Sequence, residues 1–229
     1  MRYQAVIFDL FGTLVDNFSR QEHERTLSDM GTALGVPGTD FARLWVGTFE
    51  QRATGQFASI PGNIEHILAA LDRQANAEQI AAAADIRLDF TRRGLAPRSD
   101  AVATLSQLRA AGHKLGLISD CSLEVPILWA DTPFVPLVEV PIFSCSVHLK
   151  KPDPRIYRLA CERLRVSPGD CLYVGDGSSR ELTGAWAVGM HPVLIRVPYE
   201  DSYDAHRIDA EEWHGPTVAA LSEVLGLVQ

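Results

Sequence analysis

Four short groups of polar residues in this sequence carry side chains that could do chemistry together. The groups are Asp9 with Gly12 and Thr13 in FDLFGTLVD, Ser119 with Asp120, Lys151 in LKKPDP, and Asp176 with Glu181 in GDGSSRE. Carboxylates are hard oxygen ligands for a divalent cation, and an ammonium or hydroxyl group beside them can bind an anionic substrate. Each group alone is explained equally well as a turn or a helix cap, so the chemistry depends on whether the fold brings all four together.

Each group adjoins a predicted element of regular structure. The apolar runs YQAVIF, KLGLIS and CLYV are typical of buried strands. Ser119 closes the second run, and Asp9 and Asp176 lie just beyond the first and the third. Lys151 precedes a helix predicted to begin at Pro154. Because strands alternate with helices in the second half of the chain, we expect an α/β fold with a parallel sheet covered on both faces. Sites in such folds form outside the carboxyl ends of the strands, which is where the four groups fall.

The segment after the first strand has a different pattern. Its apolar residues recur with the three- and four-residue spacing of helices, as in NIEHILAAL. Two further strands are expected later in the chain, near IFSCSV and in HPVLIRV. The sequence therefore predicts a core made of residues 1–16 and 97–229, with a helical insert of residues 17–96 over the carboxyl ends of the strands.

Composition limits the classes of partner. The 229 residues carry a formal net charge of -8 and only three lysines, so no basic stripe is available for nucleic acid or an anionic membrane. No apolar run is long enough to span a bilayer and the N-terminus has no secretory pattern, so we expect a cytoplasmic protein. The four cysteines form no CxxC pair, which favours reduced thiols over zinc or disulfides. The sequence makes no prediction of oligomeric state.

Taken in order, FDLFGTLVD, the strand end at Ser119, KKPDP and YVGDGSSRE resemble the four motifs of the haloacid dehalogenase (HAD) superfamily. The helical insert resembles the C1-type cap of that family. The resemblance implies a Rossmannoid core, a nucleophilic aspartate at Asp9, and a hydrolase that acts as a phosphatase on a small phosphorylated metabolite.

The resemblance also implies a role for each residue of the four groups. Asp9, Lys151 and Ser119 would be catalytic. The cofactor Mg²⁺ would be bound by Asp9, the backbone carbonyl of Phe11, Asp176 and Glu181. The phosphate would be bound by Gly12, Thr13, Ser119, Asp120 and Lys151. Physical chemistry agrees, because a carboxylate can attack a phosphoryl group only if cations and oriented donors offset the repulsion between the two anions.

Phe11 departs from the family pattern. Most HAD phosphatases have a second aspartate at this position, which protonates the leaving group and later activates water. A phenylalanine can do neither, which favours a leaving group that departs unprotonated, such as that of an acyl phosphate, or a long-lived phosphoenzyme. A phosphonatase is disfavoured because residues 17–97 contain no lysine for a Schiff base.

Two alternatives stay open. The L-2-haloacid dehalogenases have an aromatic residue at the position of Phe11 and bind the substrate carboxylate with a cap arginine. The insert offers Arg20, Arg25, Arg43 and Arg52 for that role. However, an extra acid such as Asp176 beside the nucleophile is unfavourable without a metal, since it raises the pKa of the nucleophile. The other alternative is a non-catalytic module that binds phosphate without turnover.

Overall fold

The computed structural model describes residues 3–207 and 210–229, and six strands of these residues form one sheet in the order β3-β2-β1-β4-β5-β6. The strands are β1 (Ala5–Phe8), β2 (Lys114–Ser119), β3 (Val140–Phe143), β4 (Cys171–Gly175), β5 (His191–Ile195) and β6 (Thr217–Val218). Every pairing is parallel, and Ile7 of β1 lies opposite Gly116 of β2 and Tyr173 of β4. The predicted α/β fold with a parallel sheet is confirmed.

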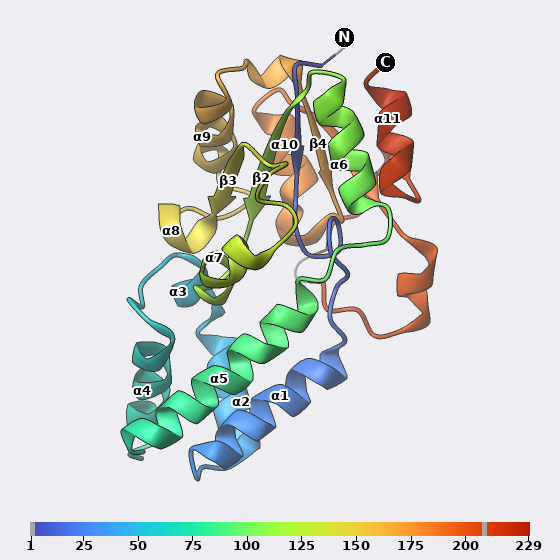
Figure 1. The fold of residues 1–229 in the computed structure, drawn as a ribbon. Coiled ribbons are helices and arrows are strands. Elements are labelled where there is room, and N and C mark those ends of the chain that lie inside the picture. Colours follow the sequence, from blue (N-terminus) through green and yellow to red (C-terminus); the bar gives the residue numbers. More distant parts are fainter. Residues whose placement is uncertain (1–2, 208–209) are drawn as a thin grey trace.

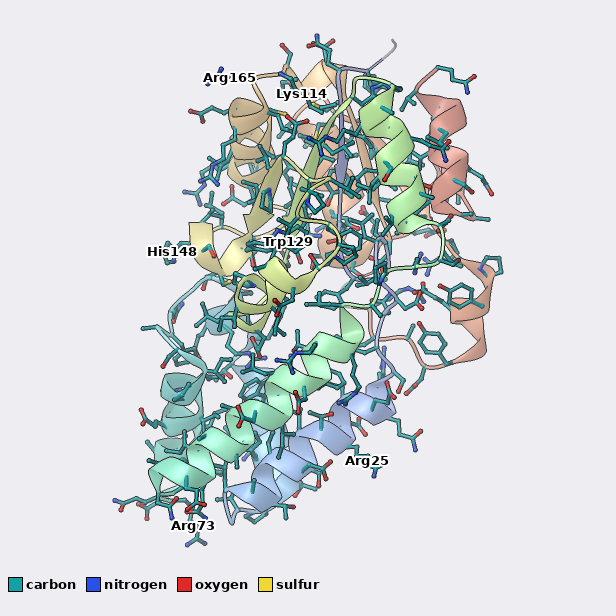
Figure 2. All side chains as sticks on the ribbon, viewed as in Figure 1. Arg25, Arg73, Lys114, Trp129, His148 and Arg165 are labelled. Atoms are coloured by element: carbon teal, nitrogen blue, oxygen red, sulfur yellow. The ribbon has the colours of Figure 1, made fainter. Side chains whose placement is uncertain are left out.

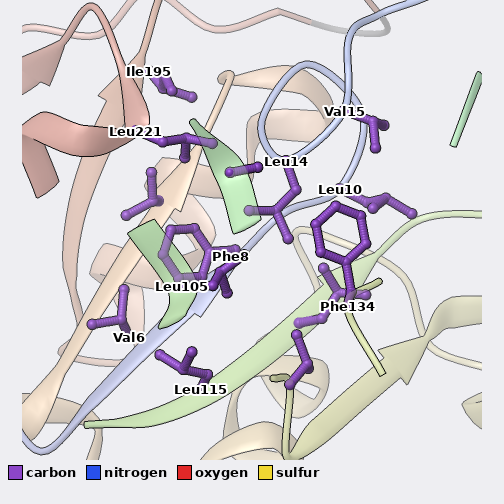
Figure 3. Packing of buried hydrophobic residues seen from close by; sticks show 14 of the residues in the cluster. Val6, Phe8, Leu10, Leu14, Val15, Leu105, Leu115, Phe134, Ile195 and Leu221 are labelled. Carbon is purple, nitrogen blue, oxygen red and sulfur yellow. The ribbon is translucent and has the colours of Figure 1, made fainter. Parts of the chain in front are cut away.

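Helices cover both faces of the sheet (Figure 1). One face packs against α6 (Ala101–Ala110) and α11 (Val224–Leu227), and the other packs against α9 (Pro154–Leu164) and α10 (Glu181–Ala187). Successive β1 residues point to opposite faces, so Val6 and Phe8 join the first core cluster whereas Ala5 and Ile7 join the second. Figure 3 shows the first cluster, in which Phe8 and Leu115 pack with Leu105 of α6.

Five helices form a separate layer beyond the carboxyl ends of the strands (Figure 1). They are α1 (Arg20–Ala33), α2 (Gly38–Gly47), α3 (Phe49–Ala53), α4 (Ile60–Ala70) and α5 (Ala77–Gly94). This layer has a hydrophobic cluster of its own, which includes the fully buried side chains of Leu27, Phe41 and Trp45. The division of the chain into a core and a cap at residues 16 and 97 stays a prediction, and this arrangement is consistent with it.

The strand predicted near IFSCSV is only partly correct. The strand β3 ends at Phe143, and residues Ser144–Val147 form the short helix α8. The side chain of Ser144, the first residue of this helix, bonds to a loop: its Oγ accepts from the Cys121 N–H at 2.9 Å and donates to the Cys121 carbonyl at 3.2 Å. The two-residue strand β6 and the short helix α7 (Glu124–Leu128) also lie outside the sequence prediction, because neither is long enough to show a period.

No membrane-spanning helix is found among the described residues. None of their helices combines the length and the apolar character that a membrane crossing requires.

Candidate active site

Asp9 lies where β1 ends and the chain turns toward the helical layer. Its backbone N–H still donates to the Val174 carbonyl of β4 at 2.9 Å, so the strand pairing fixes its position. The next residues form a tight turn in which three consecutive N–H groups, from Thr13 to Val15, point to the Leu10 carbonyl at 2.9 to 3.2 Å. Asp9 is therefore buried, with 5% of its surface exposed, and its backbone is held on both sides.

Gly12 makes this turn possible. Its φ of +76° lies in the left-handed region, and an added Cβ would lie 2.3 Å from Asn17 Nδ2 and 2.4 Å from Asp176 Oδ2. The turn therefore packs directly against the Asp176 carboxylate, which leaves no room for a side chain.

The structure brings the acids of the first and fourth groups to one place. Asp9, Asp176 and Glu181 are all buried, and one carboxylate oxygen from each lies within 4.8 Å of the others. Lys151 joins them from the third group, and its Nζ donates to Asp9 Oδ1 and to Glu181 Oε2, both at 2.6 Å. Lys151 thus contacts two of the three acids, and a group of buried carboxylates of this kind is typical of a site for a divalent cation.

Charge and burial together shift the pKa values in this cluster. Burial raises the pKa of Asp9 to about 6, with the Lys151 charge opposing the shift and the Asp176 charge adding to it. Burial and the Asp9 charge raise the pKa of Glu181 as well. Burial alone would lower the pKa of Lys151, but the carboxylates around it raise that pKa well above its usual value, so Lys151 stays charged. One ammonium charge therefore faces the carboxylates of both Asp9 and Glu181.

Glu181 is the most fully bonded of the three acids. Its oxygens accept from Lys151 Nζ, from the Tyr173 hydroxyl at 2.7 Å and from the Gly177 N–H at 3.0 Å. Gly175 lets the carboxylate pass close to the end of β4, since an added Cβ there would lie 2.2 Å from Glu181 Oε1. These contacts orient Glu181 toward Lys151, and its role as a metal ligand stays a prediction.

Asp176 is bonded less fully. Its Oδ2 accepts from Asn17 Nδ2 at 3.0 Å, and its Oδ1 accepts from the Ser178 N–H at 2.9 Å. Arg207 Nε also lies 3.6 Å from Oδ2. Each oxygen keeps a lone pair beyond these contacts, so Asp176 and Asp9 are the two acids best able to bind a cation.

The predicted phosphate-binding hydroxyls lie beside this cluster and are buried. Thr13 Oγ1 has no hydrogen-bond partner in the described structure, and Ser119 Oγ contacts only the Cys121 thiol there. Buried hydroxyls in native proteins are normally bonded, so these two are suited to donate to a bound anion. Asp120 is bonded differently: its Oδ1 accepts from the Lys151 backbone N–H at 3.0 Å, which positions the lysine.

A cavity of about 310 Å³ opens over the cluster between the sheet and the helical layer. Asp9, Phe11, Asp120 and Lys151 line it, whereas Gly12, Thr13, Ser119, Asp176 and Glu181 lie outside its lining. Phe18, Phe49 and Phe90, from the helical layer and the turn before α1, form aromatic parts of its wall. Polar side chains line it as well, among them Ser122 and Ser179 from loops that follow β2 and β4. A cavity of this size accommodates a small metabolite.

Comparison with known proteins decides the family. A model of the haloacid dehalogenase-like hydrolase family matches residues 3–189, which is most of the chain. The chain belongs to this family. As a HAD hydrolase it is an enzyme, and its relatives include both phosphatases and dehalogenases.

Three similar proteins illustrate the range of this family. Glyceraldehyde 3-phosphate phosphatase of Methanopyrus kandleri is 28% identical over 84% of each chain. (S)-2-haloacid dehalogenase 1 of a Pseudomonas species is 27% identical, covering 89% of this chain and 90% of its own. The crystal structure of a HAD phosphatase from Thermococcus onnurineus matches with a TM-score of 0.66 and 22% identity, over 98% of this chain and 97% of its own.

The dehalogenase alternative suggests four arginines of the helical layer for binding a carboxylate. Of these four, only Arg52 lines the cavity over the acid cluster. Arg20, Arg25 and Arg43 are exposed, and Figure 2 shows Arg25 pointing away from the molecule. Arg52 lines the cavity and is buried.

Several residues of this HAD site could not be singled out from the sequence. Asn17, Arg87 and Glu124 line the cavity, and Tyr173 bonds to Glu181 from inside β4. Arg87 lies in the middle of the long helix α5, where a charged residue is ordinarily solvated, so its type and position gave no signal. The one sequence signal for Asn17 is its position directly after FDLFGTLVD, which places it near the turn that follows Asp9.

Proposed function

We propose that this enzyme is a Mg²⁺-dependent phosphohydrolase, or phosphotransferase, that acts on a small phosphorylated metabolite through an aspartyl phosphate on Asp9. The observation that supports it most is the buried cluster of Asp9, Asp176 and Glu181, in which Lys151 pairs with Asp9 and Glu181 while Arg207 approaches Asp176 at 3.6 Å. An excess of buried negative charge is costly unless a cation compensates it. The helical layer of residues 17–96 would act as the cap over this site.

The donor set fits Mg²⁺. This ion prefers a few carboxylates together with waters and substrate phosphate, and Asp9 and Asp176 supply carboxylates with lone pairs to spare. The Phe11 carbonyl and Glu181 complete the proposed ligands. When bound, the cation would neutralise the phosphoryl group and lower the pKa of Asp9, which keeps the nucleophile ionised at neutral pH.

The chain's own residues would do the remaining work. An Asp9 oxygen attacks phosphorus, the bond from phosphorus to the leaving oxygen breaks, and the electron pair departs with that oxygen. Lys151, fixed by Glu181 and Asp120, stabilises the charge on the transferred group. The hydroxyls of Ser119 and Thr13 donate to its other oxygens. Water then hydrolyses the aspartyl phosphate and releases phosphate.

Phe11 restricts the substrates on which this chemistry can act. Its ring lines the cavity at the position of the missing acid and packs edge-on against Phe18, with ring centroids 6.0 Å apart. It can neither protonate a leaving group nor activate water. The proposed substrates are therefore those with a good leaving group, such as acyl phosphates, and resolution of the phosphoenzyme should be slow.

A 2-haloacid dehalogenase is the second candidate function. Phe11 in an aromatic cavity and the similarity to a dehalogenase both favour it. Asp176 argues against it, because a second buried acid beside Asp9 raises the pKa of the nucleophile and has no part in attack on carbon.

One assay separates the two functions. Acetyl phosphate, 4-nitrophenyl phosphate and 2-chloropropionate are incubated with the enzyme in Mg²⁺ or in chelator, with Asp9→Asn as the blank. Phosphate release that needs both Mg²⁺ and Asp9 supports the proposal. Chloride release that survives chelation, without phosphate release from either phosphate, contradicts it and establishes the dehalogenase.

A further inference from the structure

Glu200 and Arg207, two residues of the segment after β5, adjoin the acid cluster outside the cavity. Glu200 is 1% exposed, and its Oε2 accepts from Arg207 Nη2 at 2.8 Å. Arg207 Nε lies 3.6 Å from Asp176 Oδ2 and has no hydrogen-bond partner in the described part of the chain. Neither Glu200 nor Arg207 lines the cavity. Any effect of this pair on the reaction must therefore pass through Asp176.

The backbone is fastened on both sides of Arg207. The N–H of the preceding residue, His206, donates to the Phe18 carbonyl in the turn before α1 at 3.0 Å. The Glu211 N–H donates to the carbonyl of Gly177 at 3.0 Å, and Gly177 belongs to GDGSSRE, the same group that supplies the aspartate of the acid cluster. The approach of Arg207 to this aspartate is therefore built into the fold and is not a chance ion pair of the surface.

Glu200 holds both of the groups that approach Asp176 Oδ2. Its Oε1 accepts from the Asn17 N–H at 3.2 Å, and Asn17 Nδ2 donates to Asp176 Oδ2 at 3.0 Å. Its Oε2 holds Arg207, and an ion pair with Arg98 fixes the glutamate in turn. One neutral donor and one cation thus approach the same oxygen of Asp176, and a single buried carboxylate positions both.

The charge of Arg207 opposes a metal ion at Asp176. Two cations that share one carboxylate repel each other, so each weakens the binding of the other. Water and salt screen this repulsion poorly, because the side chains of Asp176 and Arg207 are only 1% and 16% exposed. Glu200 reduces the repulsion, since its carboxylate neutralises part of the Arg207 charge.

We propose that Glu200 and Arg207 form a positioning pair that sets the affinity of the acid cluster for Mg²⁺, with Arg207 weakening and Glu200 strengthening the binding. Both act through Asp176, so neither is a catalytic residue. This inference rests on the proposed function, since it takes Asp176 to be a Mg²⁺ ligand.

The test is a calorimetric titration of metal-free protein with Mg²⁺ alone, without substrate. Arg207→Gln removes the competing charge and should lower the Kd for Mg²⁺ by about tenfold. A merely structural role for Arg207 predicts the opposite sign, because loss of its contact would leave Asp176 less well placed. An unchanged or higher Kd in Arg207→Gln therefore overturns the proposal. Partial misfolding leaves the test intact, since it changes the stoichiometry of the titration and not the Kd.

Three further variants separate the charge of Arg207 from its shape and from a general charge effect. Arg207→Lys keeps the charge, so its Kd should exceed that of Arg207→Gln. Glu200→Gln keeps the shape of the glutamate but leaves Arg207 unopposed, so its Kd should rise above that of wild type. Arg73→Gln removes an exposed arginine at the end of the helical layer farthest from the sheet (Figure 2), and its Kd should equal that of wild type.

The opposite outcomes contradict the assignment. Equal tightening in Arg207→Lys and Arg207→Gln would show that the charge is not the cause. A Kd in Glu200→Gln at or below that of wild type would show that Glu200 does not oppose Arg207. Tightening in Arg73→Gln as large as that in Arg207→Gln would show an effect of net charge on the whole molecule.

Failure of the function and failure of the inference give different results. Mg²⁺-dependent release of phosphate from acetyl phosphate, with the same Kd in wild type and Arg207→Gln, supports the phosphohydrolase and overturns the positioning pair. A tighter Kd in Arg207→Gln, with no phosphate released by either protein, supports the pair and contradicts the phosphohydrolase. If neither protein binds Mg²⁺, the proposed metal and the pair are both overturned.

Discussion

Phe11 is the residue whose replacement tests the proposed chemistry most directly. It is half-buried, its ring lines the cavity, and it follows Asp9 by two positions in the tight turn after β1. We expect Phe11→Asp to raise the turnover of 4-nitrophenyl phosphate by about 10²-fold, near the lower end of what a general acid-base contributes. Steady-state kinetics with Mg²⁺ would measure it.

Phe11→Asn is the matched control, because asparagine has the same shape as aspartate but no titratable proton. It should give no increase, which separates acid-base chemistry from the simple opening of the cavity. An equal increase in both variants, or none in a folded Phe11→Asp protein that responds to Mg²⁺, would contradict the role assigned to position 11.

Asp9 itself predicts a pH dependence of stability. Its folded-state pKa of about 6 lies above the ordinary 3.8, so the folded protein binds this proton more tightly than the unfolded chain does. The stabilisation from this proton is complete below pH 3.8 and is lost as the pH rises through 6. In chelator, the free energy of unfolding of wild type should therefore fall relative to that of Asp9→Asn by about 2 kcal/mol between pH 4.5 and 7.5.

Denaturant unfolding of both proteins at the two pH values measures this difference. Excess Mg²⁺ should reduce it, because the cation takes the place of the proton in stabilising the Asp9 carboxylate. A gap between wild type and Asp9→Asn that does not change with pH would show that Asp9 is not destabilised by its surroundings.

At the scale of elements, the turn between β1 and the helical layer links the backbone to the acid cluster. Gly12→Ala would place a methyl group at a φ of +76° and within 2.4 Å of both Asn17 Nδ2 and Asp176 Oδ2. We expect the variant to lose about 1 kcal/mol or more of stability. Because Asp176 must move, the Mg²⁺ concentration for half-maximal activity should also rise, and a titration of activity with Mg²⁺ measures that change.

Gly226→Ala in α11 is the control for this variant. Nothing lies within 4 Å of an added Cβ there, and the position is not among the glycines with positive φ. Its Mg²⁺ requirement should equal that of wild type. A Gly12→Ala protein with an unchanged Mg²⁺ requirement would show that the turn does not position the acids.

The arrangement of strands and helices explains which site residues could be predicted from the sequence. Asp9, Ser119 and Asp176 are predictable because each ends or follows a strand of a parallel sheet, and the carboxyl ends of adjacent strands meet at one edge. Arg87 and Glu124 pair across two elements that contact only in the folded chain, a central position of α5 and the start of α7. No local sequence pattern indicates such a pair, because helical periodicity shows which face of a helix is buried but not which element packs against that face. The strand β3 ends earlier than predicted, at Phe143, because residues Ser144–Val147 are helical.

At the scale of the whole molecule, the two chain crossings between sheet and helical layer lie side by side. Val15 and Pro97 form an antiparallel bridge, and Arg98 donates to Asp16 Oδ1 at 2.9 Å. Arg98 also pairs with Glu200, which is buried in the segment after β5. The helical layer is therefore joined to the sheet at one compact junction, and the acid cluster lies next to it through Asn17.

With the proposed ligands, Mg²⁺ would bind only to the folded chain. Asp9 and Asp176 come from β1 and β4, which are far apart in the sequence, so the unfolded chain cannot offer both to one ion. Mg²⁺ at a hundred times its Kd should therefore raise the free energy of unfolding by about 2.7 kcal/mol. Asp176→Asn should lose most of that gain, whereas Asp89→Asn, which changes an acid of α5 with a 62% exposed side chain, should keep it. Equal stabilisation of wild type, Asp176→Asn and Asp89→Asn would mean that the ion binds elsewhere. The buried acids would then no longer support a phosphohydrolase.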